Sequence, residues 1–212
     1  MSTTTAPIPV VGDRYWMVLI ARAVPAGIVA LAITFSADHS VGVGWLSLAV
    51  FGVLTGAVVA VGSYWMLRGQ PRALLTAQGI VLALVGLTAI VGRLALPLPA
   101  LVIALAVGFG LSGAIELTAG IRARGVASAA RDWIFLGAAS IAVAVAVLLV
   151  PTDLSQPITV PGKVVPDLTA SVMVVGALGA YAAIVAVFPV IAGLSLKWAQ
   201  HPDAVSPLES AS

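Results

Sequence analysis

Cysteine is absent from this chain, and charged residues are scarce. Without cysteine the protein has no disulfide, no thiolate metal ligand and no cysteine nucleophile. The two histidines, His39 and His201, both fall in polar segments. No Ser/His/Asp arrangement can be assembled in the apolar part of the chain, and no cluster supplies three metal ligands. We therefore expect no enzyme activity, no catalytic residues, no metal site and no cofactor.

Apolar residues make up most of the chain. They make up 61% of the 212 residues, only 8% are charged, and the mean hydropathy is +1.15. A soluble domain usually carries about a quarter charged residues, so this composition indicates that lipid is the solvent. The net charge of +2 is small and the basic residues are single or paired. We therefore expect the protein to lie in the lipid bilayer and not to bind nucleic acid.

Six long apolar stretches account for nearly the whole chain. Each approaches the roughly 20 residues that a helix needs to cross a hydrocarbon core. The segment 1–13 is polar and has no basic run before the first stretch, so we interpret that stretch as a retained helix and not a signal peptide. The sequence predicts an all-α, polytopic membrane protein whose six transmembrane helices cover approximately 15–36, 43–67, 73–94, 98–121, 132–150 and 168–198.

The distribution of basic residues predicts the orientation of the helices. The termini and the connections after the second and fourth helices would lie on one side, which then holds most of the Arg and Lys residues. That side has Arg14, Arg68, Arg72, Arg122, Arg124, Arg131 and Lys197, and Arg22 just inside the first helix. Only Arg93 and Lys163 fall at the other side. The positive-inside bias predicts that both termini are cytoplasmic.

Segments outside the helices are few. The tails 1–14 and 199–212 are polar and are expected to be disordered. The outer connection 151–167 is the one sizeable loop, and either a small hairpin about Pro161-Gly162 or an irregular loop fits its sequence. Most tryptophans lie near the basic ends of the helices, where they predict an interfacial belt. Those are Trp16, Trp65, Trp133 and Trp198, whereas Trp45 would mark the opposite interface.

The six helices read as three repeated hairpins, at about 15–67, 73–121 and 132–198. In each hairpin the second helix carries a run rich in small residues and ends at a basic residue: Arg68, Arg122 or Lys197. A helix pair cannot bury its small-residue face alone, so three pairs would form one bundle within 15–198.

The second hairpin carries a family resemblance. The run Gly113-Ala-Ile-Glu116, followed by Ile121-Arg-Ala-Arg124, resembles the repeat of the HdeD-like membrane proteins. Arg22 and Gly27 are similarly placed in the opening helix of that repeat. The resemblance implies three helical hairpins in the bacterial plasma (inner) membrane. It also implies a stress or acid-resistance role without an established chemistry.

Small residues recur at four-residue spacing on several of the predicted helices. Such rows let helix backbones approach closely inside a membrane. The residues selected for this role are Gly52, Gly56, Gly110, Gly113 and Gly176. Two interpretations stay open, namely packing within one bundle and a seam between copies in a homo-oligomer.

Arg22 and Glu116 are the strongest candidates for a site inside the membrane. Counted from Arg14 and Arg122 at 1.5 Å per residue, they lie roughly 12 and 9 Å inside the same boundary. We predict that the two side chains pair or share a polar cavity, because an unpaired charge there is costly. Gln78 holds the place of Arg22 in the second hairpin. The pair either fixes the fold or belongs to a functional polar site.

Three functions fit these features. The first is a non-enzymatic integral membrane protein of the HdeD-like type with a stress role. The second is a small-solute transporter or channel whose path contains Arg22, Gln78 and Glu116. The third is an accessory subunit that docks into a larger membrane complex.

Overall fold

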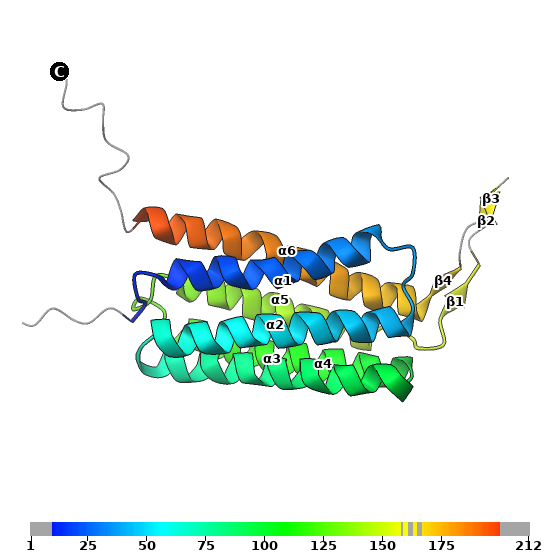
Figure 1. Cartoon of the computed structure of the whole chain (residues 1–212), viewed down its shortest axis with the longest axis horizontal. Helices are drawn as coiled ribbons and strands as arrows, with labels where there is room; N and C mark the ends of the chain where they lie inside the picture. Colours follow the sequence, from blue (N-terminus) through cyan, green and yellow to red (C-terminus); the bar gives the residue numbers. More distant parts are fainter. Residues whose placement is uncertain (1–9, 158, 161–162, 165–166, 200–212) are drawn as a thin grey trace, which may run out of the picture.

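Six long helices lie side by side along one axis and form a single bundle (Figure 1). The structure is a computed structural model and describes residues 10–157, 159–160, 163–164 and 167–199. All six helices are long and apolar enough to cross a membrane, so the predicted all-α polytopic fold is confirmed. Their bounds are α1 Tyr15–Phe35, α2 Val41–Met66, α3 Gly69–Ala95, α4 Leu98–Arg122, α5 Ala130–Leu148 and α6 Ala170–Ala199.

Short connections with defined turn chemistry separate most of the helices. Ser40 caps α2 by accepting a hydrogen bond from the Val43 N–H, and the Asp38 carboxylate in turn accepts hydrogen bonds from Ser40. Pro97 precedes α4, which makes the α3–α4 connection a sharp turn. Gly125 has a φ of +75° between α4 and α5, a conformation that favours glycine. These turns force consecutive helices to run antiparallel.

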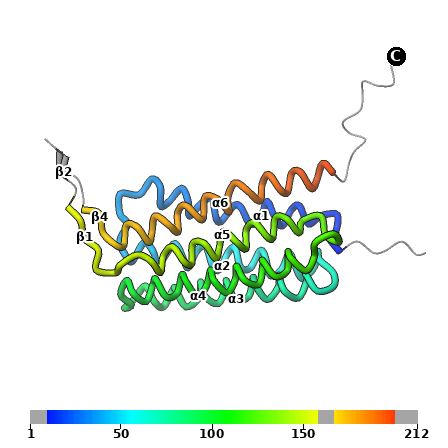
Figure 2. The backbone as a smooth tube through the Cα atoms, turned by 180° about the vertical axis from the view of Figure 1, so that it is seen from behind, coloured from blue at the N-terminus to red at the C-terminus, as the bar shows by residue number. Residues whose placement is uncertain are grey.

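The closest helix pairs are α2 with α3, α4 with α5, and α1 with α6. The closest pairs are therefore between hairpins and not within them, because each pair consists of the second helix of one hairpin and the first helix of another. Contacts between α5 and α6 are the least extensive of those between successive helices. The helix contacts therefore close into a ring in which the first and last helices lie against each other. Both views of the backbone show α1 and α6 running alongside one another (Figures 1 and 2).

Glycine residues allow α2 to approach α3, and α4 to approach α5, closely enough for their backbones to touch. A Cβ on Gly56 would lie 2.5 Å from the backbone nitrogen of Ala83 on α3, and one on Gly52 would lie 2.7 Å from Gly86 Cα. Gly113 on α4 similarly meets the carbonyl oxygen of Gly137 on α5. The glycines on the partner helices, which the sequence interpretation did not single out, are as tightly enclosed as those on α2 and α4.

Two of the predicted packing glycines do not lie at close crossings. A Cβ on Gly110 would make only an ordinary contact, 3.8 Å from the Cβ of Ala144. A Cβ on Gly176 would meet no atom within 4 Å. These two glycines therefore do not serve close packing within the bundle, and a seam between copies stays a prediction for them.

The basic end of the bundle is more ordered than the sequence predicted. Val11 forms an isolated antiparallel bridge with Leu67, and the Gly12 N–H donates to the Met66 carbonyl over 2.9 Å. The predicted disorder of the tail 1–14 is therefore wrong for its last residues. Residues 1–9 and 200–212, which hold the rest of the two predicted tails, lie outside the described residues.

Two tryptophans assigned to the interfacial belts are buried instead. Trp133 has 0% exposure and donates a hydrogen bond to the Tyr15 hydroxyl. Trp45 is 3% exposed and donates to the Leu96 carbonyl at the end of α3. By contrast, Trp65 and Trp198 are mostly exposed, as a belt requires. Both buried indoles have found a hydrogen-bond acceptor, which explains how they tolerate the interior.

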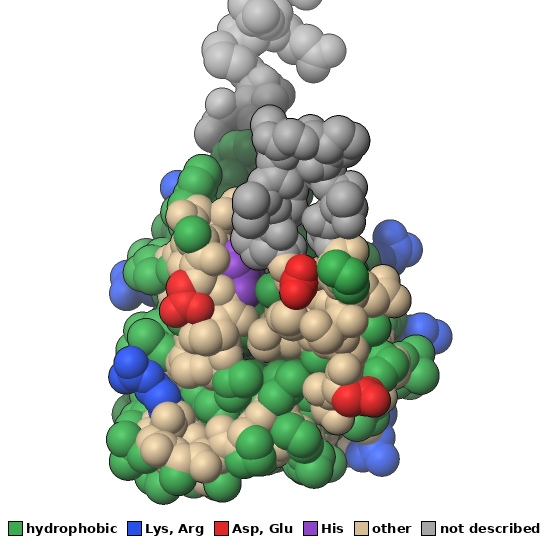
Figure 3. Space-filling view, turned by 90° about the vertical axis from the view of Figure 1, so that its right-hand side faces the viewer, with side chains coloured by type: hydrophobic (Ala, Val, Ile, Leu, Met, Phe, Trp, Pro, Cys, Tyr) green, Lys and Arg blue, Asp and Glu red, His purple; other side chains and the backbone are tan. Residues whose placement is uncertain are grey.

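The outer connection forms two short antiparallel ladders. Strand β1 (Ser155–Gln156) pairs with β4 (Leu168–Thr169), and β2 (Thr159–Val160) pairs with β3 (Lys163–Val164). The hairpin alternative for this connection is thus the one adopted. Seen from this end, acidic side chains and a histidine lie on the face and basic side chains lie toward its edge (Figure 3).

Candidate functional site

An ion pair lies inside the bundle between α1 and α4. The Nη1 of Arg22 lies 2.5 Å from Oε1 of Glu116, and Nη2 donates to Oε2 over 3.1 Å. This two-point geometry is the strongest form of an arginine–carboxylate contact. Of the two predicted arrangements, a direct pair or a shared polar cavity, the structure has the pair.

Gln78 on α3 joins the pair to a third helix. Its Nε2 donates to Glu116 Oε2 over 2.8 Å and to Ser112 Oγ over 3.2 Å. The Glu116 carboxylate therefore accepts hydrogen bonds from α1 and α3 while it is itself carried by α4. We call Arg22, Gln78, Ser112 and Glu116 the polar cluster. All three predicted site residues belong to it.

Helical spacing explains how α4 contributes two members of the polar cluster. Ser112 and Glu116 are four residues apart, so both side chains lie on one face of the helix. Gly113 lies next to Ser112 and faces α5. One face of α4 thus carries polar groups toward α1 and α3, while on the adjacent face Gly113 has no side chain and allows α5 to approach.

The polar cluster is buried. Glu116 and Gln78 have 0% exposure, and Arg22 has 4%. Charges in such surroundings persist only when paired and hydrogen-bonded, a requirement that the two-point contact meets. Two polar atoms of the polar cluster still have no partner among the described residues, namely Arg22 Nε, a donor, and Gln78 Oε1, an acceptor.

Aromatic residues cover the polar cluster on the side away from the basic end of the bundle. Phe51, Phe109 and Tyr181 come from α2, α4 and α6, and their ring centroids are 4.7–5.8 Å apart. Phe109 precedes Glu116 by seven residues, or about 10 Å along α4 in the direction away from the basic end. All three rings are buried, so they close the centre of the bundle on that side.

Tyr181 connects this aromatic layer to polar groups. Its hydroxyl lies 2.5 Å from Ser140 Oγ, and Ser140 itself donates to the Leu136 carbonyl. Because the single Ser140 proton is used in that bond, Tyr181 is the donor to Ser140. Leu136, at the position matching Arg22 and Gln78, is fully buried. The apolar residue at that third position leaves the polar cluster asymmetric.

A second aromatic pair lies toward the basic end. The rings of Tyr15 and Trp133 meet edge to face with centroids 6.0 Å apart, and both residues are buried. Tyr15 precedes Arg22 by seven residues on α1. The polar cluster therefore lies between two aromatic layers along the axis of the bundle.

Sequence reasoning missed Ser112, Ser140, Tyr15 and Tyr181. The spacing of Ser112 from Glu116 was a usable signal, since side chains four residues apart share a helix face. Tyr181 is the one tyrosine in the middle of an apolar stretch, where its hydroxyl needs a partner. Nothing in the sequence showed that Ser140 would be that partner, because the α5–α6 register depends on tertiary packing.

The fold and the polar cluster define a class of protein, a multi-pass all-α membrane protein with a buried ion pair whose hydrogen bonds join side chains of three helices. In comparisons with known proteins, no family model, no curated protein and no solved structure matches this chain. The resemblance to the HdeD-like family, which rests on the second hairpin, stays a prediction.

Proposed function

We propose that the chain is a non-enzymatic inner-membrane protein of bacteria, of the HdeD-like type, that acts in the response of the membrane to acid stress. Both termini would be cytoplasmic, at the end of the bundle where the basic residues gather. The observation that carries the proposal is the closed polar cluster. Its charges are paired, buried and covered by aromatic layers, which favours a fixed scaffold over a path for solutes.

A growth experiment tests the stress role. Cells lacking the protein are compared with complemented cells at pH 4 and at pH 7. We expect poorer survival of the deletion strain at pH 4, no difference at pH 7, and full rescue by the wild-type chain. Equal survival of both strains at pH 4 would contradict the role.

A transporter is the second candidate, because Arg22 Nε and Gln78 Oε1 are polar groups left without a protein partner. A flux assay with purified protein in liposomes separates the candidates. We expect no flux of protons or small ions above that of empty liposomes. Flux that disappears in Glu116→Gln but survives in a surface control such as Asp153→Asn would replace the scaffold proposal by a transporter.

A further inference from the structure

A groove opens between the start of α5 and the end of α6, at the basic end of the bundle. Two adjoining cavities of about 320 and 390 Å³ share Phe188 and Ile191, so they form one continuous groove. This is the place where the helix contacts are least extensive in the ring. The groove faces the surroundings of the protein and is separate from the polar cluster, none of whose members lines it.

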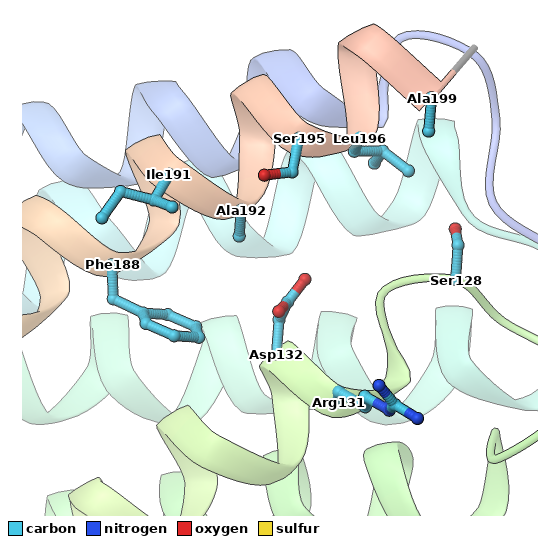
Figure 4. A pocket seen from close by; sticks show the side chains of 9 residues that line it. All are labelled: Ser128, Arg131, Asp132, Phe188, Ile191, Ala192, Ser195, Leu196 and Ala199. Carbon is cyan, nitrogen blue, oxygen red and sulfur yellow. The ribbon is translucent and has the colours of Figure 1, made fainter.

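The end of the groove near the boundary carries charge of both signs. Arg131 and Asp132 are adjacent in the first turn of α5, and Ser128 and Ser195 add hydroxyls from the preceding turn and from α6. The Asp132 carboxylate points into the space between α5 and α6, whereas the Arg131 guanidinium points to a different side (Figure 4). The two side chains therefore do not pair with each other, and each can contact a different group (Figure 4).

Asp132 is the acidic side chain of the groove. The carboxylate is half-buried, and no hydrogen bond or ion pair to it is present among residues 10–157, 159–160, 163–164 and 167–199. A carboxylate held partly out of water beside apolar side chains gains most from a cation that can also donate hydrogen bonds. Arg131, which is exposed, is free to contact an anion at the same boundary.

The other end of the groove is purely apolar. It is lined by Phe135 on α5 and by residues of α6 that include Ile184 and Val187. Phe135 and Phe188 stack at its floor with centroids 4.3 Å apart. The groove thus changes from charged to apolar along the helix axis, in the direction from the membrane surface toward its interior.

We infer that this groove binds one phospholipid with a primary-amine headgroup, such as phosphatidylethanolamine. The ammonium would bind Asp132, the phosphate would contact Arg131 and the nearby serine hydroxyls, and an acyl chain would lie along Phe135, Phe188 and Val187. A phospholipid has all three groups in this order, with an amine and a phosphate beside a long apolar chain. A free amine or a soluble anion would leave the apolar end unused.

Native mass spectrometry of the purified full-length protein tests this assignment. The protein is offered an equimolar mixture of phosphatidylethanolamine, phosphatidylcholine and phosphatidylglycerol with identical acyl chains. The choline headgroup keeps the positive charge but cannot donate a hydrogen bond, and the glycerol headgroup has no amine. We expect roughly tenfold more bound phosphatidylethanolamine than phosphatidylcholine, the ratio that one charge-assisted hydrogen bond supplies.

Matched variants identify the contacts. Asp132→Asn should bring the ratio close to one, whereas Asp153→Asn, in the outer connection, should leave it unchanged. Val187→Trp should reduce binding of all three lipids, because it fills the apolar end. Unchanged circular dichroism and melting temperature show that each variant is folded, and a variant that fails this check is replaced by Asp132→Ser or Val187→Phe.

Two results would overturn the assignment. The first is a wild-type protein that shows no preference among the three lipids, or a preference that Asp132→Asn leaves intact. The second is a groove filled by another copy of the chain. Because the chain has no cysteine, Ser195→Cys reports this directly: when isolated membranes are treated with copper phenanthroline and oxygen as the oxidant, the two thiols of such a dimer are joined in a disulfide and lipid binding is lost.

Discussion

Arg22 on α1 and Glu116 on α4 form a two-point ion pair across 94 residues of sequence. Neither residue has a substitute inside the polar cluster, since Gln78 supplies only a neutral donor. Removing one charge leaves the other buried in a low-dielectric interior, and this cost exceeds the value of the contact itself. The pair is therefore expected to fix α1 to α4 across the centre of the bundle, where the two helices themselves are not packed together.

A double-mutant cycle measures this coupling. Glu116→Ala should lower the free energy of unfolding by about 3–5 kcal/mol, because Arg22 then stays buried without a partner. The apolar double variant Arg22→Met with Glu116→Leu should be more stable than Glu116→Ala alone. The charge swap Arg22→Glu with Glu116→Arg should also exceed either of its single changes. Unfolding by denaturant in mild detergent gives these values, and additive losses would contradict the coupling.

Two glycines in the predicted packing rows should respond in opposite ways to the same change. Gly56→Ala places a methyl group 2.5 Å from the backbone of α3, so α2 and α3 must separate. We expect it to destabilise the bundle by about 1–3 kcal/mol. Gly176→Ala has open space and should stabilise by up to about 1 kcal/mol through helix propensity. Thermal melts of both variants check this, and equal effects would show that the α2–α3 crossing is wider than described.

The hydrogen bond from Trp133 to Tyr15 should be measurable in isolation. Tyr15→Phe and Trp133→Phe each remove this 3.0 Å bond, and Tyr15→Phe leaves the ring in place. We expect Tyr15→Phe to cost about 1 kcal/mol. The same change made on top of Trp133→Phe should cost clearly less, because the donor is already gone. A Tyr15→Phe effect that is equal in both backgrounds would exclude the bond.

The absence of cysteine provides a direct test of orientation. Ser128→Cys, in the turn between α4 and α5, and Thr152→Cys, in the outer connection, place single exposed thiols at opposite ends of the bundle. In intact cells a membrane-impermeant maleimide should label Thr152→Cys and spare Ser128→Cys, with both labelled after lysis. The reverse pattern would place the termini outside the cytoplasm and overturn the positive-inside assignment.

The sequence was sufficient for the number and type of the helices. Runs of about 20 apolar residues give a strong signal, and the bounds differ from the structure mainly at α3, which begins at Gly69 and not at residue 73. The depth of Arg22 and Glu116 followed from counting residues inward from basic ends. Their pairing followed in turn from the cost of leaving two nearby opposite charges apart in lipid.

Which helices pack most closely against each other could not be predicted from the sequence. The repeat pattern relates helices that look alike, whereas packing depends on which faces carry glycine. Gly79 and Gly137 lie on the first helices of their hairpins. The backbone of α2 packs directly against Gly79, and the backbone of α4 packs directly against Gly137. Small and apolar residues also occur on the faces of these helices that meet no neighbour, so in a membrane helix no polarity difference marks the face that contacts another helix.

Synthesis of the chain begins with a helix whose charged partner does not yet exist. At 5–20 residues per second, the 94 residues between Arg22 and Glu116 take about 5–20 s to translate. The main neighbour of α1, helix α6, is made last of all. During that interval the guanidinium of Arg22 must be accommodated by lipid headgroups, by water or by the insertion machinery. Completion of the bundle is thus tied to arrival of the final helix, and a ribosome that stops before α6 leaves a charged helix without its cover.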